Sequence, residues 1–250
     1  MEMWESDNFI NPNIPFLFNR NIIEYDMKEA GFSLSKEYEL LDSNTIDYLS
    51  KLRKDRRTIE IGKIQQKDEK FKNDLKMAFQ TARGLFFIEN EIDVNDLISI
   101  KKDAILTTKK CKHQEFGKNI LFRPKNEYSS YIQLEKRLEF YYSPTKLDVK
   151  GIGEDNLVNH QDYMISFIKR FFNKMETEDD ITVISFTKRF IDKYKRKELE
   201  VGYYRELSNQ PVFRTLDGDV FEEYWEDSKD ELDISYNFQK YLLKMIQIPL

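Results

Sequence analysis

Near Lys150–Gly153 the apolar residues change from mostly strand-like runs to helical spacing, and this change constrains the fold most. Downstream of it, apolar residues recur every three to four positions, as at Met164, Phe167 and Phe171, which indicates helices. Upstream, most apolar residues form short runs typical of β-strands, at 22–25, 97–100, 104–107, 120–122, 128–134 and 138–142. The sequence therefore predicts an α+β fold, with an antiparallel sheet packed against helices and then a mostly helical C-terminal unit.

One long helix is predicted within the upstream part, from Glu69 to Asn90. Its apolar side chains recur at helical spacing, at Phe71, Leu75, Phe79, Ala82 and Phe86. The first residues of the chain are instead rich in Asn and Pro, which break regular structure. We expect three parts, namely an irregular segment at 1–20, an α+β unit at 21–152 with short helices over about 45–90, and a helical unit at 153–250 with a last helix over 236–248.

The residues that the chain lacks exclude several classes of protein. It has 1 Cys and 2 His, which offer neither a disulfide pair nor the ligands of a zinc cluster. No glycine-rich phosphate-binding motif occurs, and no apolar run approaches the ~20 residues of a membrane span. We therefore expect a soluble, cytoplasmic protein with no membrane partner. The net charge of -5, from 40 basic and 45 acidic residues, leaves the partner open.

Two aspartates stand at the ends of predicted strands. Asp26 follows an apolar strand, and Asp103 lies at or near the turn of the predicted hairpin at 97–107. A buried carboxylate is costly unless it is solvated, paired or bound to a metal. On neighbouring antiparallel strands, the two would bind Mg²⁺ or Mn²⁺ and support phosphoryl transfer. The structural alternative is that Asp26 caps the next helix and Asp103 is a turn residue.

Short motifs around these aspartates occur in a characteristic order with the long helix between them. They are Ile23–Ser33 with Asp26, the hairpin Ile100–Ile105 with Asp103, Lys125–Tyr128 and Asp148–Ile152. This order resembles the polymerase core of family B DNA polymerases and covers roughly residues 20–153. The resemblance implies a palm with short helical fingers, a thumb-like helical unit, and template-directed nucleotidyl transfer without a proofreading domain.

The resemblance also implies roles for single residues. Asp26 and Asp103 would be catalytic and would hold two divalent metal ions. Arg57 and Lys63 would hold the nucleoside triphosphate, and Gly31 lies where the family blocks the ribose 2′-OH. The residues implied to contact primer–template DNA are Lys101, Lys102, Lys125, Tyr128 and Lys150. The structural alternatives are a solvated helix face for the basic segment at 53–63, a hairpin edge for the paired lysines, and core packing for the aromatic residue.

The sequence also departs from the family pattern. Lys101 replaces the first aspartate of the hairpin, and Gly31 replaces a bulky tyrosine, unless Phe32 supplies the ring instead. Two hypotheses follow from this mixture. The first is a minimal polymerase of phage or mobile-element type that acts on primer–template DNA and nucleoside triphosphates. The second is a non-catalytic phage protein with a degenerate palm that binds nucleic acid or assembles with other replication or phage proteins in the host cytoplasm.

Overall fold

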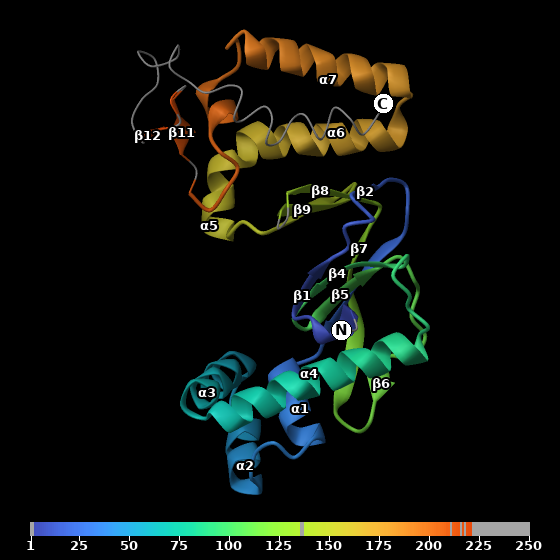
Figure 1. Cartoon of the computed structure of the whole chain (residues 1–250), viewed down its shortest axis with the longest axis vertical. Coiled ribbons are helices and arrows are strands. Elements are labelled where there is room, and N and C mark those ends of the chain that lie inside the picture. Colours follow the sequence, from blue (N-terminus) through green and yellow to red (C-terminus); the bar gives the residue numbers. More distant parts are fainter. Residues whose placement is uncertain (1–2, 136–137, 211, 216, 218, 222–250) are drawn as a thin grey trace. The chain divides into compact units, whose positions relative to one another are not determined.

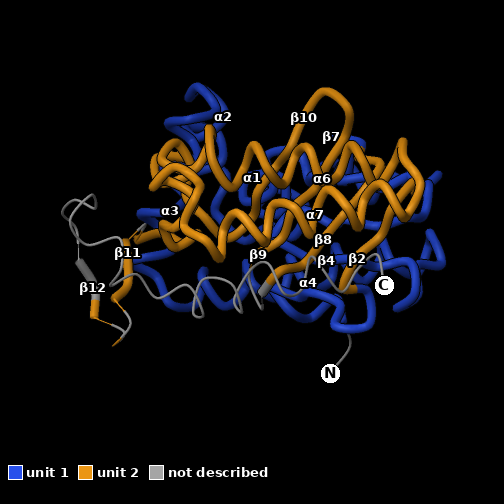
Figure 2. Tube along the Cα trace, turned by 90° about the horizontal axis from the view of Figure 1, so that it is seen from above, with its two compact units in different colours: residues 1–14, 21–127 blue, residues 15–20, 128–250 orange. Residues whose placement is uncertain are grey.

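The computed structural model describes residues 3–135, 138–210, 212–215, 217 and 219–221. The helix expected over 236–248 lies outside these residues. The chain divides into two compact units (Figure 2). Unit 1 comprises Met1–Ile14 and Asn21–Glu127, and unit 2 comprises Pro15–Arg20 and Tyr128–Leu250.

Unit 1 is built on a six-stranded sheet with the order β1-β4-β5-β3-β7-β6 (Figure 1). Its strands are β1 (Asn8–Ile10), β3 (Ile22–Met27), β4 (Leu97–Lys101), β5 (Ala104–Thr107), β6 (Glu115–Phe116) and β7 (Ile120–Tyr128). The pairs β1–β4, β4–β5, β5–β3 and β6–β7 are antiparallel. This sheet and its helices confirm the predicted α+β class, and the hairpin turns at Lys102 and Asp103 as expected.

The helices of unit 1 lie between β3 and β4 in the chain. They are α1 (Ala30–Glu37), α2 (Ser43–Lys51), α3 (Lys54–Lys67) and α4 (Glu69–Glu89), and the 3₁₀ turn η1 (Met3–Glu5) precedes the sheet. Helix α4 begins where the Asp68 side chain accepts a hydrogen bond from the backbone N–H of Phe71. Its apolar face packs on the sheet, and the ring of Phe86 lies 4.4 Å from that of Phe122. The long helix is therefore confirmed.

Residues 1–20 are not irregular throughout, which corrects the expectation from their composition. Strand β1 pairs with β4, and β2 (Phe16–Leu17) pairs with β8 (Ser130–Glu135). Strands of three and two residues are too short to show alternating polarity. They form because partner strands far along the chain supply the hydrogen bonds.

Unit 2 packs helices on one face of a second sheet, whose order is β10-β9-β8-β2. Its other elements are β9 (Leu138–Ser143), β10 (Lys146–Lys150), α5 (Glu154–Leu157), η2 (Val158–His160), η3 (Gln161–Ile165), α6 (Ser166–Thr177), α7 (Asp180–Lys195), η4 (Val201–Tyr204), β11 (Phe213–Arg214) and β12 (Val220–Phe221). The rings of Tyr142 on β9 and Phe172 on α6 stack with centroids 5.1 Å apart. The helical pattern expected downstream of Gly153 is thus present in α6 and α7.

The division between the units lies at Tyr128, whereas the sequence pattern placed it at residue 153. Strands β8 and β9 bury Ile132 and Phe140 in the same apolar cluster as Phe167 and Phe171 of α6. Unit 1 has a separate cluster around α4. The sequence pattern placed the boundary where the spacing of apolar residues changes from strand-like to helical. Packing instead joins β8 and β9 to the helices that follow them.

Candidate functional site

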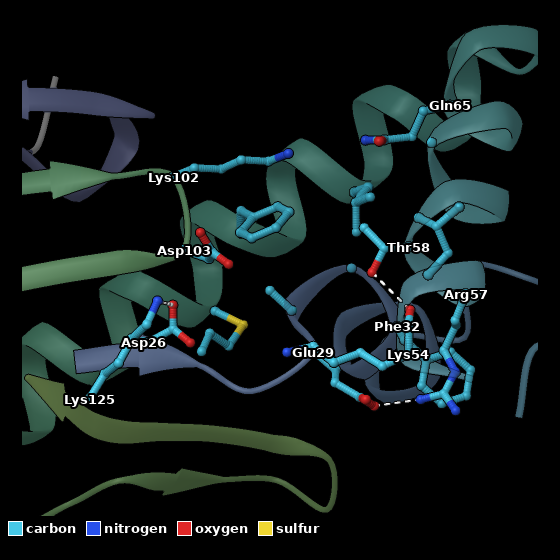
Figure 3. A pocket seen from close by; sticks show the side chains of 17 residues that line it. Asp26, Glu29, Phe32, Lys54, Arg57, Thr58, Gln65, Lys102, Asp103 and Lys125 are labelled. Carbon is cyan, nitrogen blue, oxygen red and sulfur yellow. Dashed lines mark hydrogen bonds and ion pairs between the residues drawn. The ribbon is translucent and has the colours of Figure 1, made fainter. Parts of the chain in front are cut away.

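A cavity of about 380 Å³ lies in unit 1, where β3 and the β4–β5 turn meet helices α1, α3 and α4 (Figure 3). Asp26 and Asp103 line its floor on the sheet side, and Lys102 and Lys125 lie beside them. Its helical wall includes polar side chains of α3, which are Lys54, Arg57, Thr58 and Gln65. The cavity therefore combines two carboxylates with several cations.

Asp26 and Asp103 come from neighbouring elements of the sheet. Asp26 pairs with Ala104 in the antiparallel β3–β5 register, so Asp103 lies one residue before its partner. The backbone N–H of Met27 donates to the carbonyl of Asp103 at 3.0 Å. Burial, and next the negative charge of Asp26, raise the pKa of the Asp103 carboxyl. The two side chains thus share one electrostatic environment.

Asp26 does not cap the following helix, because Glu29 occupies the N-cap position of α1. Its carboxylate is instead paired with two cations of β7. The Lys125 Nζ lies 3.4 Å from Asp26 Oδ1, and the Arg123 Nη2 lies 3.8 Å from Asp26 Oδ2. The alternative for Asp103 holds in part, since this residue does lie in the hairpin turn.

Arg57 lines the cavity, but its guanidinium is already bonded to the protein. It donates to the carbonyls of Leu49 and Leu52 at 3.0 and 2.8 Å and to the Glu29 carboxylate. Its Cζ lies 4.4 Å from the centre of the Phe32 ring. These contacts join the end of α2 to α1, so the main role of Arg57 in this structure is to hold the helical wall together.

The other residues expected to hold substrate lie differently. Lys63 is exposed on α3, pairs with Glu60 at 2.8 Å, and is not among the residues that line the cavity. Gly31 does line it, but a Cβ there would lie 3.3 Å from Cγ2 of Ile61. A side chain at Gly31 would therefore press on α3, whereas Phe32 already places a ring in the lining.

The residues expected to bind nucleic acid are divided between the units. Lys102 and Lys125 line the cavity of unit 1, and Lys101 is at the end of β4 outside that lining. Tyr128 and Lys150 belong to unit 2. The Tyr128 side chain is buried and donates its O–H to Asp148, which also pairs with Lys146. The alternative of core packing therefore describes Tyr128, whose side chain is buried in unit 2.

Arg83 of α4 is a residue that the sequence interpretation missed. It is fully buried and donates from Nη1 to the carbonyl of Lys102 in the hairpin turn at 2.7 Å. It also donates from Nε to the carbonyl of Trp4 at 2.7 Å and from Nη2 to Asp7 at 3.0 Å. The sequence did contain an indication of this role. Arg83 lies four residues after Phe79 and three before Phe86, a spacing that puts its charge on the apolar face of the predicted helix. Arg83 positions the turn that carries Asp103.

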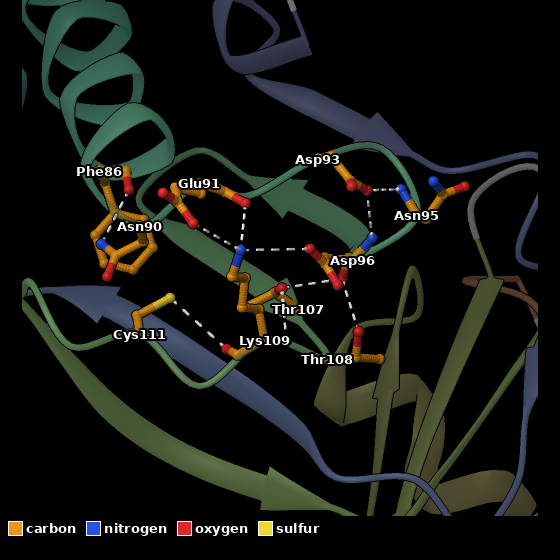
Figure 4. A network of polar contacts seen from close by, with 10 residues as sticks. All are labelled: Phe86, Asn90, Glu91, Asp93, Asn95, Asp96, Thr107, Thr108, Lys109 and Cys111. Atoms are coloured by element: carbon orange, nitrogen blue, oxygen red, sulfur yellow. Dashed lines mark hydrogen bonds and ion pairs between the residues drawn. The ribbon is translucent and has the colours of Figure 1, made fainter.

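A polar network fixes the opposite end of the hairpin (Figure 4). The carbonyl of Asp96 accepts hydrogen bonds from the Thr107 hydroxyl and the Thr108 N–H, both at 2.9 Å. The Lys109 ammonium donates to the carbonyl of Glu91 and lies 4.0 Å from the Asp96 carboxylate. Arg83 of α4 therefore holds the turn of the hairpin, and this network holds its other end to the segment that follows α4.

Asp26 and Asp103 are the two carboxylates of the cavity that would hold a divalent cation. Among the residues that the structure describes, no group of three or more His, Cys, Asp or Glu side chains could hold a metal ion. Mg²⁺ is commonly bound through one or two carboxylates, with water and substrate phosphates as its other ligands. A divalent cation would also offset the repulsion between Asp26 and Asp103.

Comparison with known proteins identifies the family of the chain but not its activity. Over the described part of the chain, no helix has the length and apolar character needed to cross a membrane. No curated protein matches the sequence. The comparisons support the expectation that this is a phage protein, and they provide no support for the resemblance to DNA polymerases. A model of the family described as "Bacteriophage PBS1 gene 130 protein" matches residues 1–250, and the chain therefore belongs to this family of phage proteins.

Proposed function

We propose that this phage protein is a metal-dependent nucleotidyltransferase whose site is the cavity of unit 1. The observation that carries the proposal is the meeting of Asp26 and Asp103 on one cavity floor, with cations of three elements around them. This arrangement suits a triphosphate, because carboxylates hold divalent cations and lysines attract phosphates. The implied reaction is attack of a primer 3′-hydroxyl on the α-phosphate, with pyrophosphate leaving.

The order of strands supports the same proposal. Strand β3, which carries Asp26, lies directly beside the hairpin that carries Asp103, and β7 lies on its other side. All four helices of unit 1 connect β3 to that hairpin. The resemblance to family B polymerases implies this succession of an aspartate strand, finger helices and an aspartate hairpin.

The chain's own residues have distinct roles in the proposed site. Bound Mg²⁺ or Mn²⁺ would supply charge neutralisation at the transferring phosphate. Lys54 and Lys102 are exposed at the cavity and bind triphosphate oxygens, a role in which they replace Lys63. Lys125, whose ammonium lies 3.4 Å from Asp26 Oδ1 and lines the cavity, is a further cation that would hold a phosphate beside that carboxylate.

Phe32 is expected to set the choice between ribo- and deoxyribonucleotides. Its ring lines the cavity, whereas a side chain at Gly31 would meet Ile61. Excluding a ribose 2′-OH requires bulk in the lining, and specificity falls when the repulsive group is removed. Phe32→Ala is expected to raise incorporation of ribonucleotides relative to deoxyribonucleotides about tenfold or more in primer extension. An unchanged ratio in Phe32→Ala would assign the selectivity to another residue.

The proposal is tested by Mn²⁺ binding to the full chain in the presence of a non-hydrolysable triphosphate, followed by primer extension. Asp26→Asn and Asp103→Asn each remove a ligand and are expected to weaken Mn²⁺ binding about tenfold or more. Asp55→Asn is the matched control, because Asp55 is exposed on α3 and is not part of the cavity lining. Equal Mn²⁺ affinity in all three variants would refute the metal site.

The second candidate is the non-catalytic phage protein, which binds nucleic acid through a palm-like unit. The ion pairs of Asp26 with Lys125 and Arg123 favour it, because they occupy the carboxylate without a metal. Under this hypothesis, the parent incorporates no nucleotide, and Asp26→Asn binds a labelled oligonucleotide as well as the parent does. If the parent incorporates nucleotides and Asp26→Asn does not, the result supports the enzyme and contradicts the non-catalytic hypothesis.

A further inference from the structure

A second feature of the molecule, a basic hollow in unit 2, is independent of the aspartate pair. It has a volume of about 420 Å³ and lies between the β9–β10 turn and helix α6. Four of its lining residues are cations, and no Asp or Glu is among the lining residues. They are Tyr142, Ser143, Pro144, Thr145, Lys146, Lys169, Arg170, Asn173 and Lys174.

The cations of this hollow differ in how far they are already paired. Lys146 pairs with Asp148 at 2.6 Å, and Lys174 lies 3.8 Å from Glu178. Lys169 and Arg170 are exposed, and neither is paired with a carboxylate in the part of the chain that the structure describes. Two positive charges are therefore available to a ligand.

A second hollow of about 360 Å³ shares the lining residue Arg170 with the first. It adds Arg189 and Lys193 of α7 together with the half-buried rings of Phe186 and Tyr203. Glu198 and Glu200 also line it, so its charge is mixed. Cations, aromatic rings and two glutamates therefore line the second hollow together.

Acidic residues cluster at the turn between the two helices that line the hollows. The acids Glu176, Glu178, Asp179 and Asp180 are all at or beside the turn from α6 to α7. Lys169 and Arg170 lie toward the start of α6, and Arg189 and Lys193 lie toward the end of α7. Lys174 lies near the end of α6, and Glu198 and Glu200 follow α7.

We propose that the two hollows joined at Arg170 form a binding track for a single nucleic-acid strand. Lys169 and Arg170 bind backbone phosphates, and the hydroxyl and amide groups of Ser143, Thr145 and Asn173 supply further donors of the kind that contact phosphate. The half-buried ring of Tyr203, which makes edge-on contacts with Tyr163 and Phe190, is the aromatic group offered to a base. The ring of Phe186 instead stacks on Phe167 and lies beneath the Lys174 ammonium. An aromatic ring beside Arg170, together with the neutral donors of the first hollow, favours a nucleic acid over an acidic protein segment, which has no base to stack.

The test measures binding of a fluorescein-labelled twenty-nucleotide oligo(dT) to the full chain by anisotropy over a series of salt concentrations. Lys169→Gln/Arg170→Gln is expected to weaken binding about tenfold and to reduce the slope of log K against log salt by about 1.4, because two phosphate contacts are lost. Lys188→Gln/Lys195→Gln is the matched control, because both lysines are exposed on α7 and line neither hollow. This control is expected to change affinity less than about twofold.

Several outcomes would overturn the track. They are an equal loss in the two double variants, no binding by the parent, displacement of the oligonucleotide by polyglutamate as readily as by unlabelled oligo(dT), and tighter binding of a duplex of equal length. Asp26→Asn is measured alongside and is expected to keep the binding that Lys169→Gln/Arg170→Gln loses. Failure of the metal site and failure of the track are therefore separate results.

Discussion

Arg83→Met is expected to destabilise unit 1 by about 1–3 kcal/mol, because it leaves the Trp4 and Lys102 carbonyls without their donor. The guanidinium is 0% exposed and donates to three segments, at Trp4, Asp7 and Lys102. Burial lowers the pKa of Arg83, while Asp7 acts in the opposite direction, so the carboxylate is part of what keeps the charge tolerable. Methionine fills a similar volume but offers no donor to the Trp4 and Lys102 carbonyls.

The measurement is urea unfolding followed by tryptophan fluorescence. The chain has 2 tryptophans, so a Trp225→Phe background makes Trp4 the only reporter, and its ring packs on Phe87 of α4. Lys76→Met on the exposed face of α4 is the control and is expected to change stability by less than about 0.5 kcal/mol. A shift of Arg83→Met as small as that of the control would show that the buried network contributes nothing. If Arg83 positions the Asp103 turn, Arg83→Lys is also expected to weaken Mn²⁺ binding while retaining part of the stability.

Acid is expected to destabilise unit 2 through His160, and His160→Leu is expected to remove this effect. The imidazole is fully buried, and neither ring nitrogen has a hydrogen-bond partner among the described residues. Burial, and next the positive charge of Arg205, lower the pKa of His160 to about 4. The unfolded chain has a histidine pKa near ~6.5, so between these values the unfolded state binds the additional proton.

The sign of the pH effect follows from that difference. Stability is fully present above about pH 6.5 and falls as the pH is lowered toward 4, by about 3 kcal/mol in total. The measurement is thermal unfolding at several pH values, in which the parent loses stability over this window more steeply than His160→Leu. His113→Gln is the control, because His113 is exposed and its replacement is expected to leave the slope unchanged. Parallel pH profiles for the parent and His160→Leu would contradict the prediction.

Elements with a clear period could be predicted from residues alone. The apolar repeat from Phe71 to Phe86 was sufficient to place α4, and the hairpin that turns at Asp103 followed from two apolar runs with a polar pair between them. The position of Asp26 at the end of a strand was equally local. Each of these features depends on side chains within one element or one tight turn, so the spacing along the chain carries the information.

Features that depend on distant partners could not be read this way. Arg83 and Asp7 are 76 positions apart, and β1 exists because β4 supplies its hydrogen bonds. The hydrogen bonds of Arg57 to Leu49, Leu52 and Glu29 could not be predicted for the same reason. Nor could the packing of β8 and β9 in one apolar cluster with α6. Burial and pairing are properties of the assembled core, where a charge loses water and needs a specific neighbour. For that reason only the tertiary structure decided which cations are available to a ligand and which hold the fold together.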